Sequence, residues 1–582
     1  MIQNQFKELW FHISKRRKIQ FFLVSILMII SSFSEIISIS AVLPFLGVLI
    51  NPEQVFQHDL MQPIIRVLQI TKPSQLIFPV TVAFICAALF TGAIRLVLLY
   101  VTTRLSAVTG ADFSINIYRR TLYQEYSIHV MRNSSEIINS VINKTNTVVG
   151  GIIGSVITFT NSLFLLIGIM SALLIIDTKI ASTAFIGIGF MYWMVMLYTR
   201  QQLKENGECI AKQSTVMIKS LQEGLGGIRD VLIDGTQNLF CSVYRRADFS
   251  LRYASRKNVF IKESPRFIME AISIILIAVL AYTMTQEEGG IDTVIPVLGA
   301  LALGAQKLLP AVQGSYGAYA AITAAKASLE DVLKLLDQDI PSYANQPSPT
   351  PIKFEQAIQL KNISFRYTEH LPWVLENVNL TIPKGSRIGF KGATGSGKST
   401  LLDIIMHLLQ ATNGELLIDD QPIGVNNKRQ WQVHIAHVPQ NIYLSDNSIE
   451  ENIAFGIQKD KIDPQRVRKA AKQAKISELI ESWKDGYQTS VGERGIRLSG
   501  GQRQRIGIAR ALYKKADVLV FDEATSALDN ETESAVMKSI ENLGRDLTIL
   551  IIAHRLSTLE VCDYVIDLSN KTDIMNNVKI AT

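Results

Sequence analysis

Cysteine is scarce in this sequence, and the scarcity excludes two classes of stabilised fold. The 582 residues include four cysteines, Cys86, Cys209, Cys241 and Cys562, which are scattered and show no paired spacing. We therefore predict neither a disulfide framework nor a zinc site. Hydrophobic residues make up 48% of the chain. That share is typical of a membrane protein with a large soluble part.

The excess of basic residues does not indicate a nucleic-acid-binding protein. The net charge of +7 could suggest one by itself. However, basic clusters such as Lys15, Arg16, Arg17 and Lys18 stand directly beside apolar runs. Basic residues in that position orient membrane helices with the positive side inside. We expect a membrane-embedded protein with no nucleic-acid partner.

Six long apolar runs predict six transmembrane helices. They lie at about 20–50, 76–103, 148–176, 180–199, 266–286 and 292–318. The linking segments 104–147 and 200–265 are polar and rich in Arg and Lys, so they are predicted to lie in the cytoplasm, as helices that continue beyond the bilayer and touch a cytoplasmic domain. Residues 1–20 predict an amphipathic interfacial helix, and residues 21–335 form the predicted six-span domain.

The first external loop contains an apolar helical stripe at about 60–70, formed by Leu60, Ile64 and Leu68. Pro73 is expected to end this helix. One interpretation is an amphipathic helix at the external interface that touches a lipid substrate. The other is a loop helix packed on the bundle.

Charged residues inside the apolar runs are candidate substrate contacts, because they are costly in lipid and usually face the bundle interior or a cavity. Lys307 lies near the middle of the sixth run. Arg95 and Arg266 lie nearer the cytoplasmic ends, where snorkelling is the alternative. Glu35 could neutralise a neighbouring cation. The predicted substrate residues are Arg95, Arg266 and Lys307.

A linker at 336–351, which contains four prolines, separates this half from a predicted soluble α/β domain at 352–582. Residues 392–400, the phosphate loop, fit G-x-x-x-x-G-K-[ST] between a strand and a helix. Backbone N–H groups in such a loop point at polyphosphate oxygens. Lys398 would reach the β and γ phosphates, and Ser399 would hold Mg²⁺. The predicted binding residues are Gly392, Thr394, Gly395, Ser396, Gly397, Lys398, Ser399 and Thr400.

Two carboxylates supply the chemistry expected beside this loop. A buried strand ends in Asp522, which would hold Mg²⁺, and Glu523, which would polarise an attacking water. Gln440 follows another strand and could reach the metal or the water. His554 follows a third strand and could hydrogen-bond the γ-phosphate.

Two further motifs complete the set. Residues 498–502, the signature loop, form a second glycine-rich helix N-terminus suited to an anion. Asp529 ends the short motif that follows the carboxylates. Tyr367 could stack on adenine, or it could be an ordinary core or surface tyrosine.

These motifs, in this order, resemble the nucleotide-binding domain of an ABC transporter. Six spans followed by one such domain resemble an exporter-type half-transporter. The resemblance implies ATP and Mg²⁺ as cofactors and active ATP hydrolysis coupled to transport, with Glu523 as the catalytic carboxylate and Gln440 and His554 beside it. It also implies that Tyr367 stacks on adenine. The signature residues implied to contact ATP are Ser499, Gly500, Gly501 and Gln502, with Asp529 nearby.

The family resemblance also implies a homodimer. Each ATP in the family lies between the phosphate loop of one subunit and the signature loop of the other, and two copies of this chain supply both. We expect a bacterial inner-membrane location, with the nucleotide-binding domain in the cytoplasm.

Shorter stretches are similar to bacterial lipid-linked oligosaccharide flippases. They are residues 35–45, Arg266 with Glu270, and residues 307–310, although Lys307 stands where that group is expected to have arginine. The resemblance implies a lipid-linked oligosaccharide or related glycolipid as substrate. The alternatives are an exporter of other lipids, such as lipid A, or of drugs, and, from another class, an ATP-gated channel or regulatory ATP-binding membrane protein.

Overall fold

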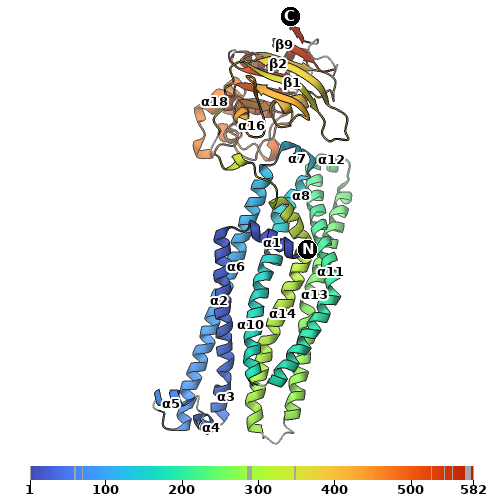
Figure 1. The fold of residues 1–582 in the computed structure, drawn as a ribbon. Helices are drawn as coiled ribbons and strands as arrows, with labels where there is room; N and C mark the ends of the chain where they lie inside the picture. Colours follow the sequence, from blue (N-terminus) through green and yellow to red (C-terminus); the bar gives the residue numbers. More distant parts are fainter. Residues whose placement is uncertain are drawn as a thin grey trace. The chain divides into compact units, whose positions relative to one another are not determined.

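The computed structural model describes residues 2–50, 52–57, 61–67, 70–176, 178–284, 291–346, 349–525, 527–542, 544, 546–553, 555–569 and 578–580. They form two compact units (Figure 1). The first unit consists of Met1–Gln124 and Arg132–Asp339, and the second of Glu125–Met131 and Ile340–Thr582. The second unit therefore includes a short helix, α7 (Tyr126–Met131), that comes from the first linking segment.

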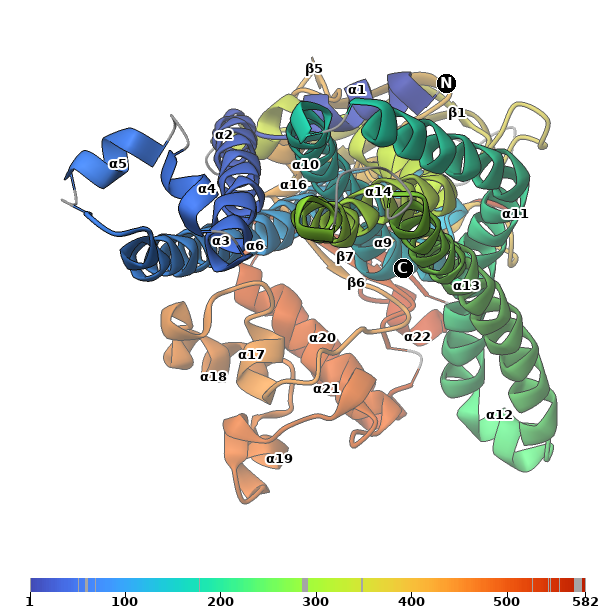
Figure 2. The ribbon, with the colours of Figure 1, turned by 90° about the horizontal axis from the view of Figure 1, so that it is seen from below.

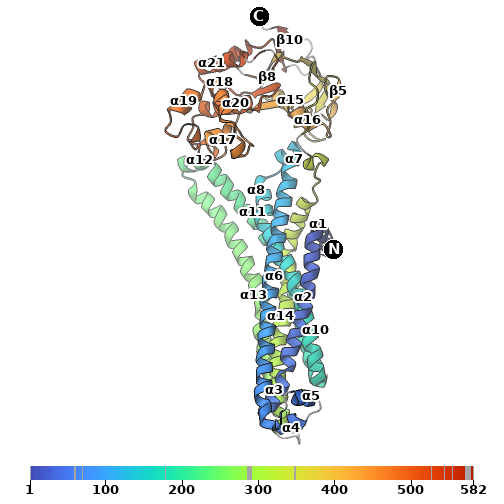
Figure 3. The same cartoon turned by 90° about the vertical axis from the view of Figure 1, so that its left-hand side faces the viewer.

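The first unit is helical, and its long helices continue through the linking segments, as predicted. Helix α6 has 46 residues and α11 has 49, far more than a bilayer requires. Figures 2 and 3 show α11 and α13 side by side, joined by α12. The helices are α1 (Ile2–His12), α2 (Lys15–Ser40), α3 (Val42–Ile50), α4 (Pro52–Gln57), α5 (Gln62–Val67), α6 (Ile77–Leu122), α8 (Ser134–Asn139), α9 (Thr145–Val148), α10 (Gly154–Ile176), α11 (Thr178–Gly226), α12 (Ile228–Ile233), α13 (Gln237–Met284) and α14 (Ile291–Leu336).

Three helical segments of the described chain are long and apolar enough to cross a membrane. They are Lys15–Ser38, Pro73–Leu122 and Ser134–Ser171. The other predicted spans fall on α11, α13 and α14, so the count of six stays a prediction. The run at 20–50 is not one helix, because α2 ends at Ser40 and α3 begins at Val42. Pro44 explains the break, since it has no N–H to donate to the carbonyl four residues earlier.

The external loop differs from its prediction. Its helix α5 has six residues, and Pro73 begins a 3₁₀ turn, Pro73–Leu76, that leads into α6 instead of ending the loop helix. Leu60 and Leu68 lie outside the described residues. Ile65 is buried against Val48 and Leu76. This packing supports the loop helix packed on the bundle.

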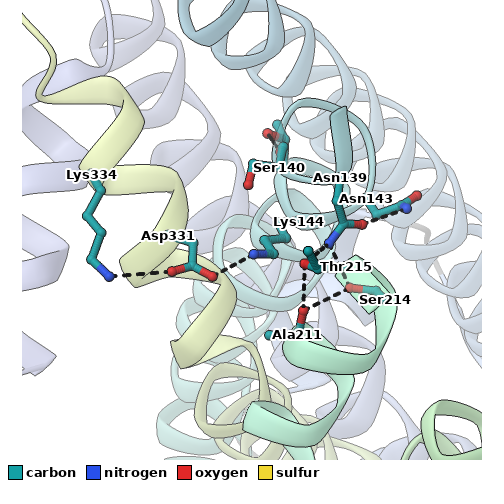
Figure 4. Close-up of polar contacts among 10 residues, drawn as sticks. Asn139, Ser140, Asn143, Lys144, Ala211, Ser214, Thr215, Asp331 and Lys334 are labelled. Atoms are coloured by element: carbon teal, nitrogen blue, oxygen red, sulfur yellow. Dashed lines mark hydrogen bonds and ion pairs between the residues drawn. The ribbon is translucent and has the colours of Figure 1, made fainter. Parts of the chain in front are cut away.

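Two π-helical turns, Ser140–Lys144 and Val149–Ile153, interrupt the helix that leads into α10. The buried Lys144 Nζ lies 2.7 Å from Asp331 Oδ2 on α14 (Figure 4). Asn139 donates to Ser214 Oγ at 2.8 Å and to Thr215 Oγ1 at 2.9 Å, both on α11. The interrupted helix is thus fixed to α14 on one side and to α11 on the other.

The second unit contains two sheets. A four-stranded antiparallel sheet has the order β2-β1-β4-β5, and a six-stranded sheet has the order β10-β9-β3-β8-β7-β6. Strands β9, β3, β8, β7 and β6 run parallel, so their carboxyl ends meet at one edge. The strands are β1 (Ala357–Phe365), β2 (Leu375–Pro383), β3 (Arg387–Lys391), β4 (Asn413–Ile418), β5 (Gln421–Pro422), β6 (Ile435–Val438), β7 (Val518–Asp522), β8 (Thr548–Ile552), β9 (Tyr564–Asp567) and β10 (Val578–Ile580).

Helices pack around these sheets over two hydrophobic cores. Figure 2 shows α17, α18, α20 and α21 gathered in one group. The four apolar residues Val518–Phe521 of β7 fit an inner parallel strand covered on both faces. The helices are α15 (Lys398–Ile405), α16 (Lys428–Gln432), α17 (Ile449–Ile453), α18 (Pro464–Gln473), α19 (Ser477–Ser482), α20 (Gly500–Lys514), α21 (Asn530–Glu541) and α22 (Leu556–Leu559).

Candidate functional site

The phosphate loop connects the end of β3 to the start of α15. Gly397 has φ 90°, and a Cβ there would lie 2.8 Å from Leu375 Cδ2, so only glycine fits this turn without strain. Lys398 folds back over the loop, and its Nζ donates to the carbonyls of Gly392 at 2.9 Å and Ala393 at 3.0 Å. The loop thus holds a cation at the N-terminus of a helix, an arrangement that suits a polyphosphate.

Ser399 and Asp522, both predicted metal ligands, lie together. Ser399 Oγ donates to Asp522 Oδ1 at 3.3 Å. Hydroxyl and carboxylate oxygens are the donors that Mg²⁺ prefers, so this pair fits that ion. Burial raises the pKa of Asp522, the Ser399 hydrogen bond opposes the rise, and neighbouring Glu523 adds to it. A divalent cation would stabilise the ionised carboxylate.

Glu523 and Gln440 are also brought together. Gln440 Nε2 donates to Glu523 Oε2 at 2.5 Å. The backbone of Glu523 has φ 50°, a left-handed conformation uncommon for residues other than glycine. Its N–H donates to the carbonyl of Ile552 at the end of β8. Strain of this kind concentrates at functional sites, and here it fixes the carboxylate beside Gln440.

Tyr367 lies at the entrance of this region. It is 46% exposed, and its hydroxyl lies 3.4 Å from Thr400 Oγ1. Phe365 contacts the ring edge to face at 5.0 Å between centroids. An exposed ring at this distance from the phosphate loop is available to a flat ligand.

The signature loop forms the N-terminus of α20. Ser499 Oγ accepts from the N–H of Gln502 at 3.2 Å, and Gln502 Oε1 accepts from the N–H of Ser499 at 2.8 Å, which makes a capping box. A Cβ on Gly501 would lie 3.1 Å from Ala527 O. Asp529 caps a different helix, α21, because its Oδ2 accepts a hydrogen bond from the N–H of Thr532 at 2.9 Å. Among the described residues, no hydrogen bond joins this loop to the phosphate loop of the same chain.

His554 lies outside the described residues, but its neighbours belong to a network that the sequence analysis missed. Glu533, buried in the first turn of α21, accepts from Thr525 at 2.9 Å, Arg555 at 2.6 Å and Thr558 at 2.5 Å. Burial alone would raise the pKa of Glu533, but these hydrogen bonds lower it. The network joins the segment after Glu523 to the segment after position 554. The sequence signal for this network is an acidic residue in the first turn of a helix. Such residues are too common to reveal the network.

Asp403 was also missed. It lies on α15, and burial together with the nearby charge of Asp522 raises its pKa to about 6. Tyr126 of α7 is close enough that Asp403 and Tyr367 both raise its pKa, after burial itself. The α7 segment thus lies near the phosphate-loop helix of its own unit. The sequence predicted that a linking segment touches the soluble domain. It did not predict that Asp403 is a residue near that segment.

The three predicted substrate residues have different surroundings. Arg95 Nη1 lies 3.0 Å from Glu35 Oε1, which confirms that Glu35 neutralises a cation; the Glu35 side chain is 4% exposed and that of Arg95 57%. Arg266 pairs with Glu270 at 2.6 Å on its own helix, α13. Lys307 lies on α14, but its side chain is outside the description.

Arg95 lines a cavity of about 860 Å³ between α2, α6 and α10, which we call the Arg95 groove. The other polar lining residues are Glu35, Asn161, Ser31, Thr102 and Thr158, and the rest of the lining is apolar and comes from all three helices. The buried Oδ1 of Asn161 has no hydrogen-bond partner among the described residues. The groove therefore offers a cation and an unused acceptor within a largely apolar surface that also carries three hydroxyl groups.

Comparison with known proteins places these features in a family. Residues 375–526 match the family described as ABC transporter, and residues 60–288 match the ABC transporter transmembrane region. The ATP-dependent lipid A-core flippase of Saccharophagus degradans is 30% identical over 462 residues, which cover 78% of this chain and 76% of that one. The chain belongs to the ABC transporter family.

Further similarities agree with this assignment. The ATP-dependent lipid A-core flippase of Cupriavidus pinatubonensis is 27% identical over 493 residues, 83% of this chain and 82% of that one. A solved structure, that of a bacterial Atm1-family ABC exporter with ATP bound, is also similar. The match covers 96% of this chain and 94% of the exporter chain, with a TM-score of 0.74 and 22% sequence identity. This ABC transporter has a helical membrane domain followed by an ABC ATPase domain, and it couples ATP hydrolysis to transport.

Proposed function

We propose that this ABC transporter flips an anionic glycolipid of the lipid A-core class across a bacterial inner membrane. The observation that carries the proposal is the Arg95 groove, where an exposed guanidinium is held by a buried carboxylate inside a largely apolar surface. A lipid with a charged headgroup presents matching chemistry. The names of the bacterial relatives support a lipid exporter more than a lipid-linked oligosaccharide flippase.

We assign the ATP-site residues as follows. Lys398 and the loop N–H groups bind the phosphates, and Tyr367 stacks on the adenine. Ser399, Asp522 and Gln440 would hold Mg²⁺, which neutralises charge on the β- and γ-phosphates when bound. Glu523 accepts a hydrogen bond from the attacking water and polarises it, and Gln440 orients Glu523. We keep His554 as the predicted contact to the γ-phosphate.

The signature loop implies a homodimer. No described contact joins it to the phosphate loop of its own chain, so we propose that Ser499, Gly500, Gly501 and Gln502 of one copy, with Asp529 nearby, close the ATP site of another. Moving a two-state equilibrium from 1:99 to 99:1 takes about 5.5 kcal/mol of differential binding, and two ATP molecules would share that amount. Hydrolysis then removes the bias and lets the cytoplasmic ATPase domains separate.

Substrate transport by the purified dimer in proteoliposomes tests the lipid. We expect Arg95→Ala to lower glycolipid translocation at least tenfold while basal ATPase activity stays within twofold, because Arg95 lies in the other unit from the ATP site. The exposed Arg245→Ala on α13 is the matched control. Unchanged translocation by Arg95→Ala would rule out the cation role. Comparing lipid A-core, lipid-linked oligosaccharide and a neutral drug as ATPase stimulators separates the three substrate classes.

Glu523→Gln tests the chemistry. The amide keeps the hydrogen bond geometry but cannot polarise water, so we expect ATP to stay bound while turnover falls by at least 10²-fold. Trapped radiolabelled ATP and released phosphate are the two measurements. An ATP-gated channel would keep its conductance in this variant, which would contradict coupled transport.

A further inference from the structure

A second cavity lies in the first unit, between the start of α2 and the middle of α6. Its volume is about 510 Å³, and we call it the α2–α6 groove. Its polar lining residues are Arg16, Arg17, Gln20 and Arg104. The rest of the wall is apolar apart from the hydroxyl of a tyrosine, and is formed by Leu23, Val24, Leu27, Tyr100, Val101, Leu105 and Val108. The groove shares no lining residue with the Arg95 groove.

The charges of this groove are only partly compensated. Arg17 donates to Asp112 Oδ2 at 2.8 Å and to Gln20 Oε1 at 2.9 Å. The side chains of Arg16 and Arg104 are exposed and, within the described part of the chain, have no hydrogen-bond or ion-pair partner. Two guanidinium groups thus remain for an external anion. Guanidinium presents paired donors that match the oxygens of a phosphate.

The position of the arginines along the helices indicates where that phosphate would come from. Arg16 and Arg17 directly precede the apolar part of α2, and Arg104 directly follows the apolar run at 76–103 of α6. The basic end therefore lies where both hydrocarbon-spanning stretches stop, at the level of lipid headgroups. The apolar wall continues from that level into the hydrocarbon region. Basic pockets between helices on the cytoplasmic side bind anionic headgroups.

We propose that the α2–α6 groove binds one anionic glycerophospholipid of the cytoplasmic leaflet as a resident ligand. Arg16 and Arg104 hold its phosphate, and an acyl chain lies along Leu23, Leu27 and Tyr100. A free phosphate ion would use the arginines but leave the apolar wall uncovered. Neither Arg95 nor Glu35 lines this groove, so the inference does not depend on the substrate assigned above.

Native mass spectrometry of the full-length protein titrated with phosphatidylglycerol tests the proposal. A cation near the membrane surface contributes about 1 kcal/mol, or about fivefold in affinity. The double variant Arg16→Gln/Arg104→Gln should therefore bind this lipid about 30-fold more weakly. The matched control Arg245→Gln/Arg246→Gln removes the same charge from exposed positions on α13 and should bind as the unmodified protein does. Basal ATPase activity reports correct folding of each variant.

Three further arms decide between occupants. Phosphatidylcholine should bind at least tenfold more weakly than phosphatidylglycerol, and inorganic phosphate at 10 mM should not displace the lipid. Equal binding of the two lipids, full displacement by phosphate, or unchanged binding by the double variant would overturn the proposal.

Cross-linking of Leu23→Cys between two copies, in a chain without other cysteines, would show that a second copy covers the groove and would also overturn the proposal. If the double variant does not fold, Arg104→Lys replaces it in the test. Lysine keeps the charge but lacks the paired donors, so lipid affinity should fall only in part.

Discussion

At the scale of single residues, Glu533 is the one whose replacement has the clearest expected effect. Removing it leaves Arg555, Thr525 and Thr558 without their shared acceptor. We expect Glu533→Ala to lower the free energy of unfolding by about 2 kcal/mol. Because the network flanks the segments that carry Glu523 and His554, kcat for ATP should fall by at least tenfold while KM changes less than threefold.

Steady-state ATPase kinetics and thermal unfolding measure these two effects. Glu533→Gln keeps an acceptor oxygen and should recover part of kcat, which a purely structural defect would not show. Glu531→Ala, in the same first turn but exposed, is the control. A fall in kcat matched by an equally large rise in KM would contradict a positioning role.

His437 gives the ATPase unit a pH dependence. Burial lowers its pKa to about 4, whereas the unfolded chain has the ordinary value near 6.5. Between these values the unfolded state binds a proton that the folded state excludes, so the contribution of His437 to the free energy of unfolding should fall as pH drops from 6.5 to 4. Asp403, whose pKa is raised to about 6, contributes in the opposite direction over this range, so the prediction concerns the difference between the unmodified protein and a His437 variant. The full loss is about 3 kcal/mol. Denaturant unfolding from pH 8 to 4 measures it: the stability difference between the unmodified protein and His437→Gln should change by that amount over this range, while the difference for the exposed His370→Gln stays constant.

At the scale of elements, the ion pair between Lys144 and Asp331 fixes the interrupted helix that leads into α10 to α14. The Lys144 side chain is 5% exposed and that of Asp331 29%, so removing Lys144 leaves a partly buried carboxylate with only the exposed Lys334 as partner. We expect Lys144→Ala to cost about 3 kcal/mol and the pair Lys144→Met/Asp331→Leu to cost less. Lys334→Ala, which removes the exposed and more distant partner of Asp331 at 3.6 Å, should cost under about 1 kcal/mol. Thermal unfolding of the unmodified protein and the three variants measures these costs. A larger loss of stability in Lys334→Ala than in Lys144→Ala would contradict the role given to the Lys144 pair.

The same elements show what sequence could predict. The phosphate loop was predictable because its contacts are local: the partners of Lys398 lie within six residues. Glu35 and Arg95 were identifiable as charges in apolar runs, although only the structure pairs them. Lys144 and Asp331 are 187 positions apart, and Glu533 reaches residues 8 to 25 positions away on different elements. No short pattern encodes contacts of that range, because they depend on how whole helices pack.

At the scale of the whole molecule, the dimer is the feature to test. With Cys86, Cys209 and Cys241 replaced by serine, Ser396→Cys and Ser499→Cys should cross-link two chains when ATP is bound. The remaining Cys562 is buried, and burial raises its pKa to about 12, so it should not react. Gel electrophoresis under non-reducing conditions distinguishes the products. A cross-link confined to a single chain would contradict the shared site.

The membership of α7 in the second unit has a consequence for biogenesis. Residues Glu125–Met131 leave the ribosome about 450 residues before the last part of the unit that they join. At 5–20 residues per second they wait roughly 20 to 90 s for that partner. During this interval a nascent chain carries helix α7 without its final neighbours, and a chaperone that holds such segments would have its longest opportunity there.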